Sequence, residues 1–256
     1  MKVVILAGGL GSRLSEETHL KPKPMVEIGG HPILWHIMKT YSFYGINDFI
    51  VCCGYKGHII KEYFNNYFMH NSDVTFDLQS NEISFHRSKS EKWKVTLVDT
   101  GDAAMTGGRL LAVKEYVCHD ELFCFTYGDG LINANISKLI KFHRSHGAIA
   151  TLTAAHPPAR FGALQFDQDR VSAFSEKPDG DGMMINAGYF VLSPKVFDFL
   201  DGPQCVWEQG PLNQLTQDKQ LYAYKHLGFW HPMDTLADKT LLHKMWIEGK
   251  ASWKVW

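Results

Sequence analysis

The sequence predicts an α/β protein with a Rossmann-like, mostly parallel mixed sheet flanked by helices, and a smaller antiparallel extension. Two observations predict this class. Over the first 150 of the 256 residues, short apolar segments alternate with amphipathic helical segments. After residue 150, strand-like segments follow one another without long helices between them. Parallel strands need long crossover connections, whereas antiparallel neighbours are joined by short turns, so the sheet should change character there.

The first half opens with "VVILA", a continuous apolar strand. The next segment carries apolar residues at 33, 34, 37, 38, 41 and 44, which share one helix face, and Pro32 and Gly45 mark its ends. The same reasoning places strands at 3–7, 48–54, 94–100 and 122–130, and helices at 33–44, 56–68, 106–117 and 136–146.

The second half contains strand-like segments at 150–156, 161–167, 170–178 and 187–193, with turn residues at 167–169. We expect these strands to form a mixed or antiparallel extension that covers one side of the functional site. A helix at 235–248 closes the chain, and the polar segment 70–92 is expected to be a hairpin or an arm.

Composition excludes several classes of protein. Lys plus Arg is 26 and Asp plus Glu is 27, so no basic excess indicates a nucleic-acid or membrane-surface binder. There is no apolar run of membrane-spanning length, and the apolar start is too short for a secretion signal. The five cysteines form no CxxC pair, which predicts buried free thiols in a reducing cytoplasm. The 13 histidines include no HExxH motif that would indicate zinc.

The segment "GGLGSRL" follows the first strand, where a phosphate-binding loop would lie. It lacks the Gly-Lys-Ser/Thr end of a Walker loop, and Leu14 occupies the third glycine position of GxGxxG. Glycines let backbone N–H groups close on phosphate oxygens, to which Arg13 and Lys23 can add charge. A tight turn with solvated cations is the alternative. Pro22 and Pro24 on either side of Lys23 favour a fixed charge.

Two aspartates are candidates for a metal site. Asp129 follows the strand of 122–130, and ligands bind beyond the carboxyl ends of strands in open parallel sheets. Asp234 lies in "FWHPMDT". Together they could hold Mg²⁺ against a triphosphate, because Mg²⁺ commonly uses one or two carboxylates plus phosphate oxygens. A helix cap or a turn residue is the alternative for each.

Several motifs together resemble the sugar-1-phosphate nucleotidylyltransferases. "LAGGLGSRL" and "KPKPMVEIGGHPILWHIM" are similar to that family's G-G-x-G-[ST]-R-L signature and its Lys-Pro lysine. "FTYGDG" resembles its first metal aspartate, and "FSEKP" with "NAGYFV" resembles its sugar-binding segment. "SEET", "VDTGDAAMTGGR" and "FWHPMDT" are most like the members that transfer a cytidylyl group to glucose 1-phosphate. Thymidylyl- and uridylyl-transferring relatives usually carry a proline where Glu16 and Glu17 stand, and Ser12 replaces the usual Thr.

The resemblance implies that CTP and glucose 1-phosphate give CDP-glucose and pyrophosphate, with Mg²⁺ as cofactor. It also implies a cytoplasmic homo-oligomer that serves dideoxyhexose and O-antigen synthesis, with no nucleic-acid or membrane partner. Two alternatives stay open. One is a sugar-1-phosphate nucleotidylyltransferase that uses UTP or dTTP. The other is a regulatory protein that binds a nucleotide sugar without turnover.

The resemblance also implies a role for individual residues. Arg13 would contact the β- and γ-phosphates, Lys23 the α-phosphate, and Asp129 and Asp234 the metal. The nucleotide would be bound by Leu6, Ala7, Gly8, Gly9, Leu10, Gly11, Ser12, Arg13, Lys23, Ala104, Arg109 and Gly128. The sugar phosphate would be bound by Gly162, Glu176, Lys177 and Asn186.

The resemblance places the base against 6–9, 104–109 and Gly128, and main-chain groups of 6–9 and 104–108 are expected to contact the cytosine. Arg109 would contact either base or phosphate. All 256 residues should form one domain: a nucleotide-binding core at 1–150, a sugar-phosphate-binding part at 151–234, and a C-terminal helix and tail at 235–256.

Overall fold

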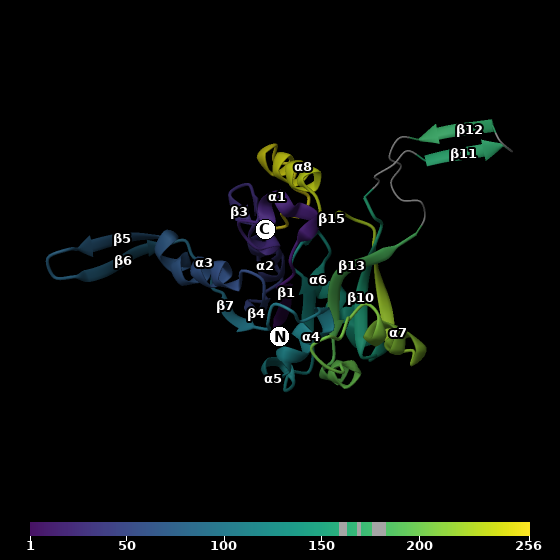
Figure 1. The fold of residues 1–256 in the computed structure, drawn as a ribbon, viewed down its shortest axis with the longest axis horizontal. Coiled ribbons are helices and arrows are strands. Elements are labelled where there is room, and N and C mark those ends of the chain that lie inside the picture. Colours follow the sequence, from purple (N-terminus) through teal and green to yellow (C-terminus); the bar gives the residue numbers. More distant parts are fainter. Residues whose placement is uncertain (159–162, 168–169, 176–182) are drawn as a thin grey trace.

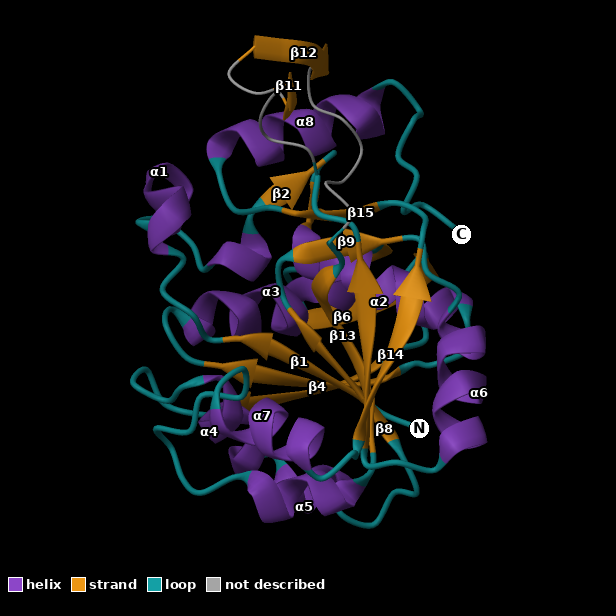
Figure 2. Cartoon of the chain, turned by 90° about the vertical axis from the view of Figure 1, so that its right-hand side faces the viewer, coloured by secondary structure: helices purple, strands orange, loops and turns teal. Residues whose placement is uncertain are grey.

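A central seven-stranded sheet organises the molecule and confirms the predicted class (Figures 1 and 2). The computed structural model describes residues 1–158, 163–167, 170–175 and 183–256. In order across the sheet, the strands are β14 (Leu221–His226), β10 (Ala150–Ala155), β13 (Ile185–Leu192), β8 (Phe123–Tyr127), β1 (Val3–Ala7), β4 (Asp48–Cys53) and β7 (Lys94–Asp99). Strand β13 runs antiparallel to both of its neighbours, and the other neighbouring pairs are parallel.

Helices cover both faces of the sheet (Figure 2). One face packs against α2 (Ile33–Phe43), α3 (Gly57–His70), α6 (Ile136–His146) and α8 (Leu236–Ile247). The other face packs against α4 (Thr106–Ala112), α5 (Lys114–Val117) and α7 (Gly210–Gln217). Because side chains alternate along a strand, Cys52 and Cys53 enter opposite cores. None of the described helices has the length and hydropathy needed to cross a membrane.

The expected helix at 106–117 is divided at Val113 into α4 and α5. Strand β14 and helix α7 were not predicted from the sequence. The strands after residue 150 were expected to form a mixed or antiparallel extension, and β10 and β13 form theirs within the central sheet. Only β11 (Ala163–Asp167) and β12 (Arg170–Ser175) form a separate antiparallel hairpin among the strands expected there. The difference arises because β13 pairs with β8 of the first half.

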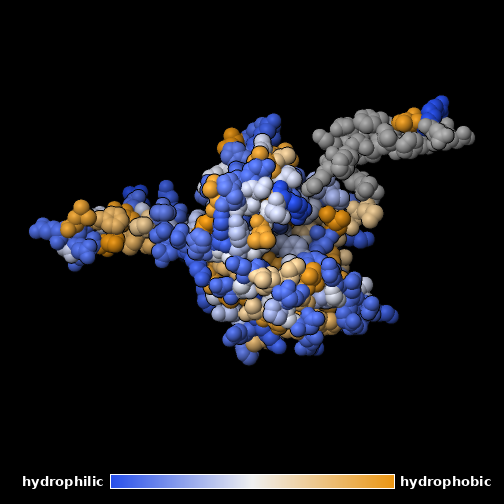
Figure 3. Space-filling model, in the orientation of Figure 1, coloured by the Kyte–Doolittle hydropathy of each residue, from blue (hydrophilic) through white to orange (hydrophobic). Residues whose placement is uncertain are grey.

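The predicted arm is a hairpin of β5 (Ser72–Asp77) and β6 (Glu82–Ser88), which projects from the end of α3 (Figure 1). It is less polar than expected. Val74 pairs with Phe85 and Phe76 with Ile83, so these four side chains share one face of the hairpin. Phe76 and Ile83 are more than half exposed, at 52% and 56%. Figure 3 shows apolar residues gathered along this arm.

Short elements bring distant residues to one edge of the sheet. Strand β9 (Gly130–Ile132) pairs with β15 (Trp230–Pro232), with Gly130 opposite Pro232. The Met233 N–H also donates to the Asp129 carbonyl, at 2.8 Å. This pairing places Asp129 and Asp234 beside each other. The remaining short elements are α1 (Ser15–Thr18), β2 (Glu27–Ile28), β3 (His31–Pro32), and the 3-10 helices η1 (Ser12–Leu14), η2 (Lys23–Met25) and η3 (Pro194–Phe199).

Helix α8, which follows Asp234, packs on the turn between β2 and β3. Gly29 in that turn has φ +59°, and a Cβ there would lie 1.9 Å from the Trp246 ring. Gly30 also has a positive φ, +82°, but a Cβ there would meet no atom within 4 Å. Both glycines therefore have a left-handed backbone, but only Gly29 is packed against another side chain.

We predict that Gly30→Ala lowers the free energy of unfolding by about 1–2 kcal/mol, the cost of a left-handed backbone for alanine. Gly29→Ala should lose a further ~1–3 kcal/mol through overpacking against Trp246. Urea denaturation measures both values. Equal losses would show that the Trp246 ring moves away from an added Cβ at no cost in stability.

Candidate active site

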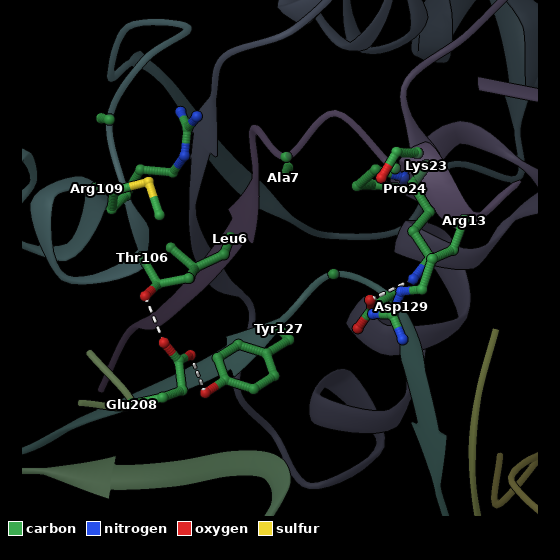
Figure 4. A pocket seen from close by; sticks show the side chains of 16 residues that line it. Leu6, Ala7, Arg13, Lys23, Pro24, Thr106, Arg109, Tyr127, Asp129 and Glu208 are labelled. Carbon is green, nitrogen blue, oxygen red and sulfur yellow. Dashed lines mark hydrogen bonds and ion pairs between the residues drawn. The ribbon is translucent and has the colours of Figure 1, made fainter. Parts of the chain in front are cut away.

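A pocket of about 390 Å³ opens at the carboxyl ends of β1 and β8 (Figure 4). This is where an open parallel sheet normally binds its ligand. The residues that line it are Leu6, Ala7, Gly9, Gly11, Ser12, Arg13, Lys23, Pro24, Ala104, Met105, Thr106, Arg109, Tyr127, Gly128, Asp129 and Glu208. Most of the predicted nucleotide residues are therefore in one place, although Gly8 and Leu10 do not line the pocket.

Two cations and two carboxylates meet at one side of this pocket. The Lys23 Nζ donates to Asp129 Oδ2 at 2.6 Å and to Asp234 Oδ1 at 2.8 Å. The Arg13 guanidinium donates to Asp234 Oδ2 at 2.8 Å. Lys23 is only 8% exposed, whereas the Arg13 side chain is 71% exposed. The structure thus brings together the four residues predicted to be catalytic, and it excludes a solvated position for Lys23.

The electrostatic environment keeps Lys23 charged. Burial alone lowers the pKa of its ammonium group, but the charges and hydrogen bonds of Asp129 and Asp234 outweigh burial and raise the pKa above its usual value. Lys23 is the first residue of η2 and has Pro22 and Pro24 as its neighbours. The pocket therefore contains a cation that is both permanent and fixed in position.

The two carboxylates form an arrangement that fits Mg²⁺. Their oxygens converge, because Asp129 and Asp234 both accept from the same Lys23 Nζ. The described residues contain no group of three or more His, Cys, Asp or Glu that could enclose a metal. A two-carboxylate site suits Mg²⁺, which takes its remaining ligands from phosphate and water.

Arg109 joins two segments of the pocket wall through hydrogen bonds of its guanidinium group. Its side chain is almost fully buried and donates to the Gly8 carbonyl at 2.9 Å, the Gly101 carbonyl at 2.7 Å and the Thr100 hydroxyl at 2.7 Å. Burial lowers the pKa of the guanidinium. These bonds tie the glycine-rich loop to the segment after β7. A contact between Arg109 and base or phosphate stays a prediction.

The start of α4 is braced by a distant segment. The Met105 N–H donates to the Pro203 carbonyl at 2.9 Å, and the N–H groups of Gly107 and Gly108 donate to the Cys205 carbonyl at 2.9 and 3.1 Å. These three donors are engaged within the protein and are therefore not free to contact a base.

Three further side chains of the pocket, Thr106, Tyr127 and Glu208, were not predicted as site residues from the sequence. The Tyr127 Oη donates to Glu208 Oε1 at 2.5 Å, and the Thr106 hydroxyl donates to Glu208 Oε2 at 2.6 Å (Figure 4). Thr106 and Tyr127 lie within the "MTGGR" and "TYGDG" motifs, which was the available signal. Glu208 lies in a segment without a motif, so nothing in the sequence indicated it.

Of the predicted sugar-phosphate residues, only Asn186 belongs to the described part of the chain. Its Nδ2 donates to the Tyr127 Oη at 3.4 Å, next to the pocket wall. Gly162, Glu176 and Lys177 lie outside the described residues. Their roles stay predictions.

Known proteins resemble this chain in sequence and in fold. The sequence matches the nucleotidyl transferase family over residues 2–231. It is 61% identical over 256 residues to glucose-1-phosphate cytidylyltransferase of Salmonella typhi, and 47% identical over 258 residues to a probable glucose-1-phosphate cytidylyltransferase of Bacillus subtilis. Each alignment covers 100% of both chains.

Among solved structures, HddC from Yersinia pseudotuberculosis superimposes with a TM-score of 0.69 at 22% identity, over 96% of this chain and 99% of that one. This likeness supports the fold.

Proposed function

Because the chain belongs to the nucleotidyl transferase family, we propose that it transfers the cytidylyl group of CTP to α-D-glucose 1-phosphate, giving CDP-glucose and pyrophosphate. The 61% identity to a glucose-1-phosphate cytidylyltransferase over the full length of both chains supports the substrates. The observation that carries the chemistry is the meeting of Lys23, Arg13, Asp129 and Asp234 at one pocket.

The reaction makes electrostatic demands on the protein. A sugar phosphate is already an oxyanion at pH 7, so it attacks the α-phosphate of CTP without a general base. Two polyanions must approach each other, and pyrophosphate must leave with its negative charge. Lys23 is fixed and protonated before substrate arrives, so its ammonium can stabilise the α-phosphate without reorganising. Arg13 is mostly exposed, which lets it turn from Asp234 to the β- and γ-phosphates.

Asp129 and Asp234 would hold Mg²⁺ in this proposal. The bound ion would neutralise charge on the phosphates of the nucleotide. Lys23 donates two of its three N–H groups to these carboxylates, which leaves the third for a substrate oxygen.

We propose that the chain acts as a homo-oligomer and that the apolar face of the β5–β6 hairpin packs against a second copy. A two-stranded hairpin is marginal in water on its own, and an exposed apolar hairpin is prone to association. Val74, Phe76, Ile83 and Phe85 share that face. Phe85 is held at the base of the arm by Phe68 of α3, with ring centroids 5.0 Å apart.

A cytoplasmic location fits the chemistry of the cysteines. All five are free, and Cys52, Cys53, Cys124 and Cys205 are buried. Burial raises the pKa of the Cys53 thiol to about 11 and that of Cys124 to about 12, so both stay protonated and unreactive. We propose that the enzyme works in the cytoplasm and that its product serves dideoxyhexose and O-antigen synthesis, as the family resemblance implies.

A pyrophosphate-release assay with glucose 1-phosphate and each of CTP, UTP, dTTP, GTP and ATP tests the activity. CTP and UTP differ at ring position 4, and one mismatched buried polar group costs roughly 1–3 kcal/mol. We therefore expect kcat/KM for CTP to exceed that for UTP by about tenfold to a hundredfold. Preference for another nucleotide would establish the transferase alternative, and release with none would establish the regulatory one.

Asp234→Asn tests the metal site. We expect kcat to fall by roughly a hundredfold or more, since metal stabilisation of the transition state contributes several kcal/mol. The Mg²⁺ concentration for half-maximal rate should also rise. Asp198→Asn, at an exposed carboxylate in η3, is the matched control and should change neither value. A lower kcat with unchanged Mg²⁺ dependence would show that Asp234 acts through Lys23 and Arg13 instead.

The hairpin proposal predicts a change of assembly on one face only. Phe76→Ser with Ile83→Ser should reduce the oligomer to a smaller species in sedimentation velocity. Thr75→Ala with Ser84→Ala alters a cross-strand pair on the opposite face and should leave the assembly intact. A monomeric wild-type protein, or equal effects of the two pairs, would contradict the proposal.

A further inference from the structure

Glu208 is a carboxylate of the pocket for which the reaction as described has no use. Figure 4 shows it with Thr106 and Tyr127 on a wall away from Lys23, Arg13 and Asp129. Glu208 precedes α7, Thr106 begins α4, and Tyr127 ends β8. Three separate segments thus build one polar wall.

In the hydrogen bonds around Glu208, the neighbouring hydroxyl groups donate and the carboxylate accepts. The Trp207 N–H donates to the Thr106 hydroxyl oxygen at 3.0 Å, so the Thr106 hydrogen is available for Glu208 Oε2. Burial, and then the nearby Glu208 charge, raise the pKa of Tyr127, so that its hydroxyl stays protonated and donates to Glu208 Oε1. Both neighbours are donors, and Glu208 acts as the acceptor.

The backbone around Glu208 is held in place. The carbonyls of Pro203 and Cys205 accept from the start of α4, and Trp207 is fully buried. A Cβ on Gly108 would lie 2.1 Å from the Pro203 carbonyl oxygen, so this close approach requires glycine. The Glu208 side chain is exposed towards the pocket, but its position is set by this bracing.

Glu208 has acceptor capacity left for a ligand. An ionised carboxylate offers about four acceptor positions, and the two hydroxyls occupy two of them. Within the described part of the chain, its partners are these hydroxyls and not a cation. A phosphate is excluded beside it by like charge. Neither substrate carries a cationic group at neutral pH, so the ligand group has to be a neutral donor.

Sugar hydroxyls are the donors nearest to the phosphates. In both substrates the sugar carries the phosphate ester, whereas the base of CTP lies beyond the ribose ring. Tyr127 lies two residues before Asp129 and contacts Asn186. The polar wall therefore lies in the same pocket as the phosphate position, on the other side of it.

Resting on the proposed function, we infer that Glu208 binds sugar hydroxyls of a substrate and sets sugar specificity, with Tyr127 and Thr106 positioning its carboxylate. The shared chemistry is a pair of neighbouring hydroxyl donors on a sugar ring. The hexose of glucose 1-phosphate and the ribose of CTP are the two possible sources, and substrate analogues distinguish them.

The experiment compares wild type with Glu208→Gln, which keeps the size and replaces one acceptor oxygen by a donor. Steady-state kinetics are measured with CTP, dCTP, glucose 1-phosphate and its monodeoxy analogues. Wild type should disfavour the relevant deoxy analogue by about tenfold to a hundredfold in kcat/KM. Glu208→Gln should raise KM for the parent substrate by a similar factor, change kcat little, and abolish this discrimination.

Loss of discrimination against deoxyglucose 1-phosphates would identify the hexose, and loss against dCTP would identify the ribose. Asp201→Asn removes a carboxylate from the same segment outside this pocket and should leave every ratio unchanged. Tyr127→Phe, which retains the carboxylate but removes one positioning donor, should shift KM and the deoxy ratio in the same direction by less.

Unchanged deoxy ratios in Glu208→Gln, with or without a lower melting temperature, would reduce Glu208 to a structural brace and overturn the inference. A collapse of CTP-over-UTP preference alone would also overturn it, because Glu208 would then contact the base. Failure of the proposed function is distinguishable: wild type would not use CTP with glucose 1-phosphate. The deoxy comparison would then be run with whichever nucleotide and sugar phosphate are turned over.

Discussion

The site depends on one buried ammonium group placed between two carboxylates. Asp129 and Asp234 would repel each other at this separation, and Lys23 neutralises the pair from a largely buried position. Removing such a cation would leave two close, partly buried negative charges without compensation, which is far more costly than losing a surface ion pair. The β9–β15 pairing brings the two aspartates together, and η2 places Lys23 between them.

The rest of the pocket is held by main-chain hydrogen bonds. The Arg109 guanidinium donates to carbonyls of the glycine-rich loop and of the segment after β7. The carbonyls of Pro203 and Cys205 accept hydrogen bonds from the N–H groups at the start of α4. Both sets of hydrogen bonds fix loops around the pocket that have few apolar side chains of their own. A polyanion-binding pocket needs such rigidity, because donors that reorganise on binding stabilise a transition state less.

What could be predicted from the sequence was local. The glycine-rich loop, the prolines around Lys23 and the aspartate after β8 each lie in a segment of a few residues whose chemistry is self-contained. The alternation of strands and helices in the first 150 residues could also be predicted, because each segment shows its own pattern of apolar residues. The pairing of β13 with β8 was not, because an isolated strand gives no sign of its neighbour. Glu208 depends on three segments that meet only in the folded chain. Gly162, Glu176 and Lys177 remain assignments from motif resemblance.

The antiparallel strand β13 has a consequence for how the protein unfolds. It lies between β8 of the first half and β10 of the second, so one hydrogen-bonded sheet crosses the expected boundary at residue 150. A fragment ending there would expose the edge of β8 and lose Phe190 and Leu192 from its core. We therefore expect the two halves to unfold together, because local opening on one side of β13 removes pairing from the other.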